Sequence, residues 1–199
     1  METIQVKKID CNGCSVHCLE SGPTDGLPVV LLHGMKFQAE TWRELGTIQA
    51  LSALQLRVTA LDMPGFGKSP DCTQEPAEIL VEALQQLGVQ QAVLIGPSMG
   101  GRIALEFAMA HPQRITGLVL VGAVGVEENR ARLGMITVPC LIVWGEDDQV
   151  SPLANSDILL SKLPDARREI VAKASHPCYL DQPAHWHDLL RTFFTTRFS

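Results

Sequence analysis

The sequence predicts an α/β protein in which helices cover both faces of a mostly parallel β-sheet. Most of the chain alternates short, continuous apolar runs with longer amphipathic stretches. Strands that are buried on both faces have such apolar runs, and the alternation is typical of βαβ units. The first twenty residues differ, because apolar and polar side chains alternate there on either side of an Asn-Gly pair. That pattern predicts an antiparallel hairpin at the start of the sheet.

The hairpin is expected at residues 3–10 and 14–20, with Asn12 and Gly13 in the turn. Cys11 and Cys14 flank this turn and form a C-x-x-C pattern, which also occurs in redox motifs and zinc sites. No second C-x-x-C follows, and a redox motif would open a helix, so the hairpin interpretation is favoured. The chain has six cysteines, and in an unsecreted protein we expect them to be reduced thiols.

The remaining elements follow from the alternation. Buried parallel strands are expected at residues 29–33, 56–62, 91–96, 115–122 and 139–145, with a weaker one at 168–172. Helices are expected at residues 39–54, 76–87, 99–110, 152–163 and 183–195. No internal repeat, low-complexity tract or linker interrupts this order. We therefore expect one domain over residues 1–199.

Composition excludes several classes of partner. The 199 residues carry 16 basic and 22 acidic side chains, a net charge of -6, which disfavours nucleic acid and anionic membrane surfaces. No segment approaches the roughly 20 apolar residues of a membrane span, and no apolar leader region follows the two lysines near the N-terminus. We expect a soluble, cytoplasmic protein without membrane association.

Ser98 is the candidate nucleophile. The predicted strand at 91–96 runs directly into Gly-Pro-Ser-Met-Gly-Gly at 96–101 and then into a predicted helix. This strand-turn-helix context is what the G-x-S-x-G nucleophile elbow requires. The turn is so sharp that we expect a strained serine backbone and no room for side chains at Gly96 and Gly100.

His176 is the candidate general base, because a serine hydroxyl needs a base within hydrogen-bond reach. It follows the last predicted strand, which places it at the carboxyl edge of the sheet with Ser98. The histidines at 17, 111, 185 and 187 lie in the hairpin or on predicted helices, and we expect structural roles for them.

The imidazole needs a carboxylate that orients it, and Glu146-Asp147-Asp148 follows the apolar strand at 139–145. Asp148 is preferred, because the order serine, aspartate, histidine fits an elbow of this kind. Asp147 stays open as the alternative. Glu127 and Glu128, after the strand at 115–122, are more remote alternatives for this carboxylate.

A tetrahedral intermediate needs two backbone N–H donors for its oxyanion. Met99, the residue after the nucleophile, supplies the first, and Met35, in the loop after the strand at 29–33, is chosen for the second. His33 is expected to brace this loop by hydrogen bonds. Lys36 could attract an acidic substrate, but a solvated surface lysine is the favoured interpretation.

Five segments resemble the α/β-hydrolase superfamily. They are HGMKFQAETW at 33–42, LDMPGFGKS at 61–69, GPSMGG at 96–101, LIVWGEDD at 141–148 and SHPCYLDQPAHWH at 175–187. The last segment, together with the TIQV start and the HGMKF loop, is similar in particular to the CCG1-interacting-factor-B type. The resemblance implies an eight-stranded sheet, a Ser98, Asp148 and His176 triad, and acyl-serine chemistry on esters, amides or thioesters.

The chain departs from many superfamily members in length. Only residues 123–138 separate the fourth and fifth buried strands, so we expect no cap domain. The site should be open, or shaded by one short helix around residues 127–133. A serine nucleophile also disfavours the haloalkane dehalogenase and epoxide hydrolase chemistries of this fold, which use an aspartate.

The sequence thus predicts a serine hydrolase that acts on a small-molecule acyl substrate, with no cofactor and no metal. Three alternatives remain open. The acyl group could pass to an acceptor other than water, such as a thiol. The triad could serve C–C bond hydrolysis or perhydrolysis. The chain could also be a non-catalytic interaction protein that keeps the fold, since fold does not fix function; a protein partner cannot be read from the sequence.

Overall fold

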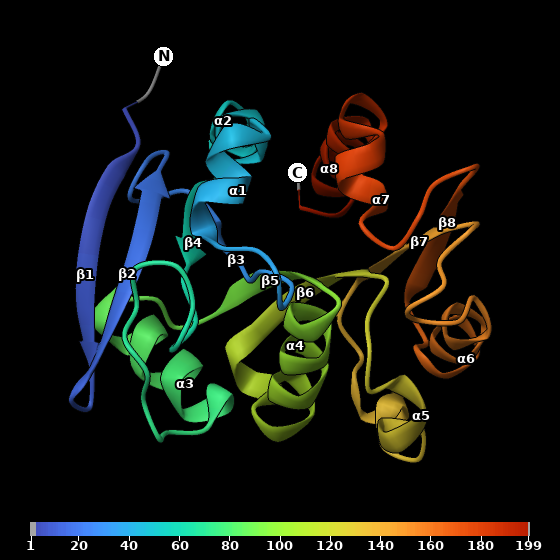
Figure 1. Cartoon of the computed structure of the whole chain (residues 1–199), viewed down its shortest axis with the longest axis horizontal. Helices are drawn as coiled ribbons and strands as arrows, with labels where there is room; N and C mark the ends of the chain where they lie inside the picture. The colour runs from blue at the N-terminus through green and yellow to red at the C-terminus, as the bar shows by residue number, and fades with distance from the viewer. Residues whose placement is uncertain (1–2, 199) are drawn as a thin grey trace.

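The computed structural model describes residues 3–198 and contains one eight-stranded sheet (Figure 1). The strands are β1 (Gln5–Cys11), β2 (Cys14–Ser21), β3 (Pro28–Leu31), β4 (Arg57–Leu61), β5 (Ala92–Pro97), β6 (Ile115–Val121), β7 (Cys140–Gly145) and β8 (Ala166–Val171). Their order is β1-β2-β4-β3-β5-β6-β7-β8, and only the β1–β2 and β2–β4 pairs are antiparallel. The predicted sheet with its N-terminal hairpin is confirmed.

Helices cover both faces of the sheet, as predicted (Figure 1). One face carries α1 (Ala39–Glu44), α2 (Thr47–Ser52), α7 (Cys178–Asp181) and α8 (Pro183–Arg197). The other face carries α3 (Pro76–Gln86), α4 (Met99–Ala110), α5 (Val126–Asn129) and α6 (Ala154–Lys162). Among residues 3–198, no helix has both the length and the apolarity needed to cross a membrane.

The core explains why the central strands have continuous apolar sequences. In β5, Leu94 packs into the layer under α3 and α4, whereas Val93 and Ile95 pack into the layer under α1, α2 and α8. All three side chains are fully buried. Because successive strand side chains point to opposite faces, a strand covered on both faces must be apolar at every position.

The turn of the hairpin forms at the predicted residues. Asn12 has φ 53° and Gly13 has φ 86°, so both adopt the left-handed conformation of a type I′ turn. The register places Cys11 opposite Cys14. The hairpin interpretation of the C-x-x-C pattern is therefore confirmed.

The helix expected over residues 39–54 is in fact two helices, so that prediction was wrong in its continuity. Gly46 separates α1 from α2 and has φ 84°, a left-handed conformation that ends α1. The amphipathic pattern continues across the break because Trp42, Ile48 and Leu51 all pack into the same apolar layer.

The expectation that all cysteines are reduced was also wrong. Cys14 and Cys72 form a disulfide, with a Cα–Cα distance of 5.8 Å. No sequence pattern indicates this pairing, because Cys72 lies in a loop 58 residues further on that folds back to the hairpin. The other four cysteines are free and buried, and desolvation raises the pKa of Cys11 and Cys18 to about 11.

Reducing the disulfide should lower stability measurably. Closing a loop of 58 residues restricts the unfolded chain, which corresponds to at most about 4 kcal/mol. We expect alkylation of the denatured, unreduced protein to modify four cysteines, and chemical denaturation to show a lower midpoint for Cys72→Ser. Modification of all six cysteines without reductant would contradict the pairing.

Candidate active site

Ser98 occupies a strained turn between β5 and α4. Its backbone has φ 52° and ψ −114°, a conformation that is rare for residues other than glycine. A Cβ on Gly96 would lie 2.2 Å from the Gly100 carbonyl oxygen, and one on Gly100 would lie 2.8 Å from the His33 carbonyl oxygen. The glycines at both positions therefore allow the close approach that the sequence predicted.

The turn holds Ser98 at the carboxyl edge of the sheet, next to the end of β6. The Ser98 N–H donates to the Val121 carbonyl oxygen at 2.9 Å, and its carbonyl accepts the Val124 N–H at 3.3 Å. Ser98 is partly exposed. Its backbone hydrogen bonds thus anchor it at this edge.

Asp148 and His176 contact each other at the same edge. His176 Nδ1 lies 2.8 Å from Asp148 Oδ2, and the Asp148 carboxylate is fully buried. The other oxygen, Oδ1, accepts the N–H groups of Val150 and Ser151 at 2.8 and 2.9 Å. These two bonds orient the carboxylate and leave Oδ2 for the imidazole.

The structure distinguishes Asp148 from the other acidic residues that the sequence allowed as partners of His176. Asp147 is exposed, and its N–H donates to the Ala174 carbonyl oxygen. Glu127 pairs with Arg130, and Glu128 is exposed. Within residues 3–198, Asp148 is the acid that pairs with His176.

The second ring nitrogen of His176 faces away from this pair. Nε2 is buried, and within residues 3–198 it has no hydrogen-bond partner, Ser98 Oγ included. Hydrogen bonds between a nucleophile and its base are often long in unliganded enzymes and shorten when substrate binds. Because Nδ1 donates to Asp148, Nε2 carries the free lone pair of the ring and is available as a hydrogen-bond acceptor.

Gly122 makes room for the Asp148–His176 contact, and sequence reasoning missed it. It has φ 50°, and a Cβ there would lie 3.0 Å from Asp148 Oδ2 and 3.1 Å from His176 Nδ1. Gly145 has a similar role, since its Cβ would lie 2.2 Å from the Ser175 carbonyl oxygen. The available signal was a glycine at the end of each of two predicted strands at this edge.

The two expected oxyanion donors both adjoin Ser98. Met99 is the first residue of α4, where an N–H has no acceptor inside the helix. The loop that carries Met35 passes close to the nucleophile, because a Cβ on Gly34 would lie 3.7 Å from Ser98 Cβ. Within residues 3–198, neither amide donates to a protein acceptor.

His33 braces the loop that carries Met35, as expected. Its Nε2 accepts the Met63 N–H at 3.0 Å, so the proton is on Nδ1, which donates to the Gly34 carbonyl oxygen at 2.9 Å. The ring is neutral in this arrangement, and burial lowers the pKa of His33 below its usual value.

An aromatic cluster joins the Met35 loop to the His176 loop. Tyr179, three residues after His176, lies 6.3 Å from Phe37, 5.1 Å from Trp42 and 6.0 Å from Trp186, measured between ring centroids. Trp42 Nε1 also donates to the Leu32 carbonyl oxygen at 3.1 Å. These residues fix two loops of the site relative to each other, a role that the sequence pattern did not reveal.

The remaining histidines contact other parts of the protein. His17 pairs with buried Asp62 at 2.9 Å, His187 contacts Thr47, and the His111 ring packs on Phe107.

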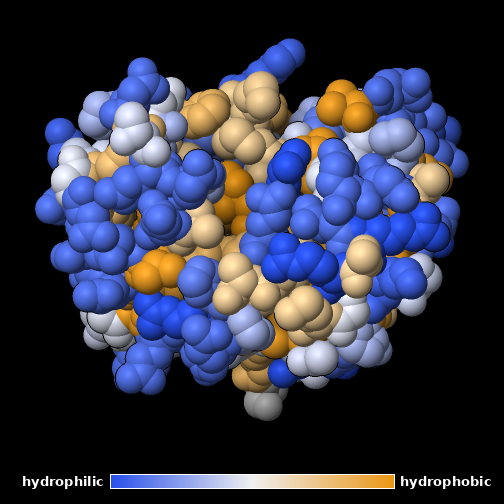
Figure 2. Space-filling model, turned by 90° about the horizontal axis from the view of Figure 1, so that it is seen from below, coloured by the Kyte–Doolittle hydropathy of each residue, from blue (hydrophilic) through white to orange (hydrophobic). Residues whose placement is uncertain are grey.

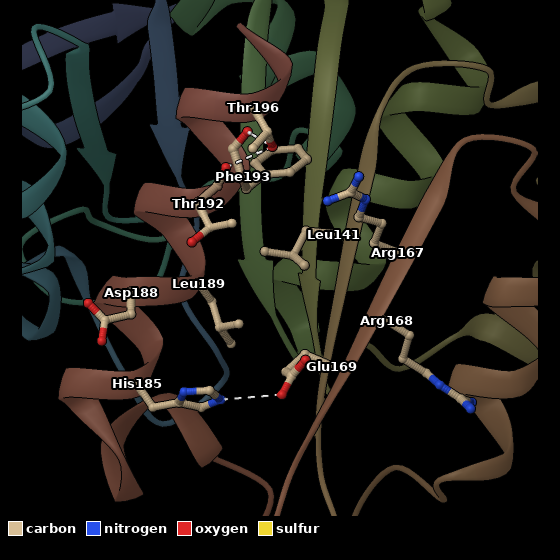
Figure 3. Close-up of a pocket in the computed structure, with 10 residues that line it drawn as sticks. All are labelled: Leu141, Arg167, Arg168, Glu169, His185, Asp188, Leu189, Thr192, Phe193 and Thr196. Atoms are coloured by element: carbon tan, nitrogen blue, oxygen red, sulfur yellow. Dashed lines mark hydrogen bonds and ion pairs between the residues drawn. The ribbon is translucent and has the colours of Figure 1, made fainter. Parts of the chain in front are cut away.

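His185 pairs with Glu169 at 3.5 Å. Figure 3 shows this last pair in a cavity of about 330 Å³ between β8 and α8. That cavity contains none of the triad candidates.

The predicted absence of a cap domain is confirmed. Residues 123–139 hold only α5 and a short 3₁₀ turn (Leu133–Met135). The helix α5 packs beside α4, where Asn129 Nδ2 donates to Glu106 Oε1 at 3.3 Å. Ser98 is partly exposed.

The alpha/beta hydrolase fold family matches residues 28–133, which is more than half of the chain. This chain belongs to the α/β-hydrolase family. The predicted CCG1-interacting-factor-B type is also supported: a CIB-like hydrolase from Thermoplasma acidophilum superposes on this α/β hydrolase with a TM-score of 0.93 and 28% identity, over 99% of both chains.

Two groups of curated relatives are similar in sequence to this α/β hydrolase. The Rattus norvegicus protein named putative protein-lysine deacylase ABHD14B is 34% identical over 96% of this chain and 93% of its own length. The Danio rerio protein ABHD14A is 37% identical over 85% of this chain and 64% of its own length. A Bacillus subtilis naproxen esterase shares the fold at 20% identity, with a TM-score of 0.86 over 97% of this chain and 92% of its own.

Adding a methyl group at Gly122 should impair the site more than the fold. In Gly122→Ala, strain at positive φ should cost about 1–2 kcal/mol, and the Cβ should also displace Asp148 or His176. We expect kcat on an activated ester to fall on the order of tenfold. Gly88→Ala is the matched control, because Gly88 has φ 65° and no neighbour within 4 Å of its Cβ. Equal kcat for both variants would show that Gly122 has no role in the site.

Buried, neutral His33 should make stability fall in acid. Because its pKa is lowered in the folded state, the unfolded chain binds a proton near pH 6.5 that the folded chain does not. Stability should therefore be lost as pH falls through 6.5, by up to about 1.4 kcal/mol per pH unit for one group. His187, whose pKa burial also lowers, adds in the same direction. The free energy of unfolding, measured with urea at several pH values between 5 and 7.5, should change less steeply with pH in His33→Gln than in wild type. The same pH dependence in both proteins would contradict this role of His33.

Proposed function

We propose that this chain is a serine hydrolase that cleaves a carboxylic ester or a related acyl bond through an acyl-enzyme on Ser98. One observation supports the proposal most. A serine on a strained turn, a histidine whose Nε2 lacks a partner among the described residues, and a buried carboxylate on Nδ1 all lie at one edge of the sheet. These are the parts that nucleophilic acyl transfer requires.

In the first half of the reaction, Ser98 Oγ attacks the acyl carbon and its proton passes to His176 Nε2. The imidazolium that forms is stabilised by Asp148, whose Oδ2 accepts the Nδ1 proton at 2.8 Å. The carbonyl oxygen becomes an oxyanion and accepts hydrogen bonds from the Met35 and Met99 amides. Collapse of the intermediate breaks the bond to the leaving group, which takes the proton from His176.

In the second half, water attacks the acyl-enzyme. His176 Nε2 takes a proton from this water, the Met35 and Met99 amides again hold the oxyanion, and the bond to Ser98 Oγ breaks. The proton returns to Ser98, and a carboxylic acid leaves. The partly exposed position of Ser98 suits an acyl group that is carried on a larger molecule.

Acyl-lysine side chains are one such class of substrate. Relatives named putative protein-lysine deacylase match 96% of this chain at 33–34% identity. An ε-amide of lysine presents a short acyl group on a long, flexible stem, which can reach an open site without a cap. We therefore include acyl-lysine amides with esters in the proposed substrate range.

A panel of p-nitrophenyl esters and acyl-lysine peptides tests this function. We expect wild-type turnover of at least one class, and a loss on the order of 10³-fold or more in kcat for Ser98→Ala. Ser161→Ala is the control, since Ser161 is exposed on α6 and bonds only within its helix. The same turnover in Ser98→Ala, or none in wild type, would overturn the proposal.

A further inference from the structure

A cavity of about 210 Å³ lies beside the Ser98 turn, on the side of the sheet that carries α3 and α4. Its lining is mostly apolar and includes Phe66, Cys72, Gln74, Pro76, Met99 and Ile103. Figure 2 views the face formed by α3, α4 and α5 and shows apolar side chains gathered along its middle, between hydrophilic side chains on both sides.

The cavity adjoins the expected oxyanion site through Met99. The Met99 amide is an expected donor to the substrate oxygen, while its side chain lines the cavity, as does Ile103 one turn further along α4. On the other side of Phe66 lies a more exposed hollow, which Met35, Lys36 and Gln38 line. Met99 therefore borders the apolar cavity and Met35 borders the polar hollow, and Phe66 lines both.

We propose that the apolar cavity receives the acyl chain, and that the Cys14–Cys72 disulfide limits how long a chain it accepts. The proposal rests on the function proposed above and adds the substrate class, which is esters or amides of short to medium unbranched acyl groups. The polar hollow beside Lys36 is left for the leaving group.

The volume sets the chain length. About 210 Å³ corresponds to roughly seven water molecules at ~30 Å³ each, and a methylene group is of similar size. The five carbons of a hexanoyl chain beyond its carbonyl fit within this volume, and each buried methylene would gain roughly 0.8 kcal/mol. A longer chain would contact Cys72, Gln74 or Pro76. Each methylene that the cavity cannot accommodate should lower kcat/KM on the order of tenfold.

The outer wall of the cavity is held by the hairpin. Cys72 is bonded to Cys14 on β2, and Gln74 Nε2 donates to the Asn12 carbonyl oxygen in the hairpin turn at 2.8 Å. The Gln74 contact is exposed, so it is a weak restraint on its own. Opening the disulfide would therefore loosen residues 72–75, while Pro76 at the start of α3 and the inner wall on α4 stay in place.

Reduction can be carried out without interfering with acyl transfer. Cys72 is partly exposed, whereas Cys14 is buried, so we expect a reductant to reach the bond from the Cys72 side. A water-soluble phosphine donates two electrons, water supplies the oxygen, and the products are two thiols and the phosphine oxide. A thiol reductant is unsuitable, because it could itself accept the acyl group from Ser98.

The first arm of the test changes the inner wall. We would measure kcat/KM for p-nitrophenyl acetate, butanoate, hexanoate, octanoate and decanoate. Ile103→Phe, which fills the cavity, should lower the hexanoate-to-acetate ratio at least tenfold, and Ile103→Ala should raise the octanoate-to-acetate ratio. Ile79→Ala is the control, since Ile79 is buried on α3 but does not line the cavity; its ratios should equal those of wild type.

The second arm opens the outer wall. Phosphine treatment of wild type, and Cys72→Ser without phosphine, should each raise the octanoate-to-acetate and decanoate-to-acetate ratios at least threefold. Phosphine should cause no further change in Cys72→Ser. Thermal unfolding of each sample would verify that it is folded at the assay temperature.

The outcomes separate this inference from the proposed function. If wild type hydrolyses acetate through Ser98 but neither Ile103 variant changes the ratios, the cavity is not the acyl site and the inference is wrong. If the Ile103 variants act as expected but reduction and Cys72→Ser do not, the disulfide has no role in chain length. If wild type hydrolyses no ester or amide and Ser98 is inert, the proposed function itself has failed.

Discussion

The architecture of the site depends on the sharp turn that connects β5 to α4. Ser98 has φ 52°, and this conformation persists because the surrounding chain leaves no alternative. A glycine at position 96 lets the start of α4 pass against the strand, and a glycine at position 100 lets the helix approach the loop after β3. The turn therefore places a hydroxyl at the carboxyl edge of the sheet and, in the next residue, a backbone N–H that has no acceptor inside the helix.

Every other group of the site has to reach that same edge. Asp148 follows β7 and His176 follows β8, and the parallel direction of these strands brings both side chains to the edge where Ser98 lies. The contact between them needs the missing side chain of Gly122, and it is kept in place by two N–H donors to Asp148. The aromatic cluster around Tyr179 then ties the loop of the base to the loop of the second oxyanion donor. The same contacts therefore stabilise the fold and orient the side chains of the site.

Much of this arrangement could be predicted from the sequence, because local rules determine it. Buried strands have apolar runs, Asn12 and Gly13 fit a type I′ turn, and the glycines around Ser98 reflect close packing of adjacent segments. What could not be predicted depends on contacts between distant segments. Three consecutive acids after β7 look alike until burial and the His176 contact separate Asp148. The Cys14–Cys72 pair forms only because a loop after β4 folds back over the hairpin.

The central claim is that Ser98 is an activated nucleophile, and covalent labelling tests it most directly. A fluorophosphonate reacts with a serine only when a base removes its proton and N–H donors stabilise the developing charge. We expect one adduct per chain, located on Ser98 by peptide mass spectrometry, and no adduct in Ser98→Ala. Failure of folded wild-type protein to react, or equal labelling of Ser98→Ala, would contradict it.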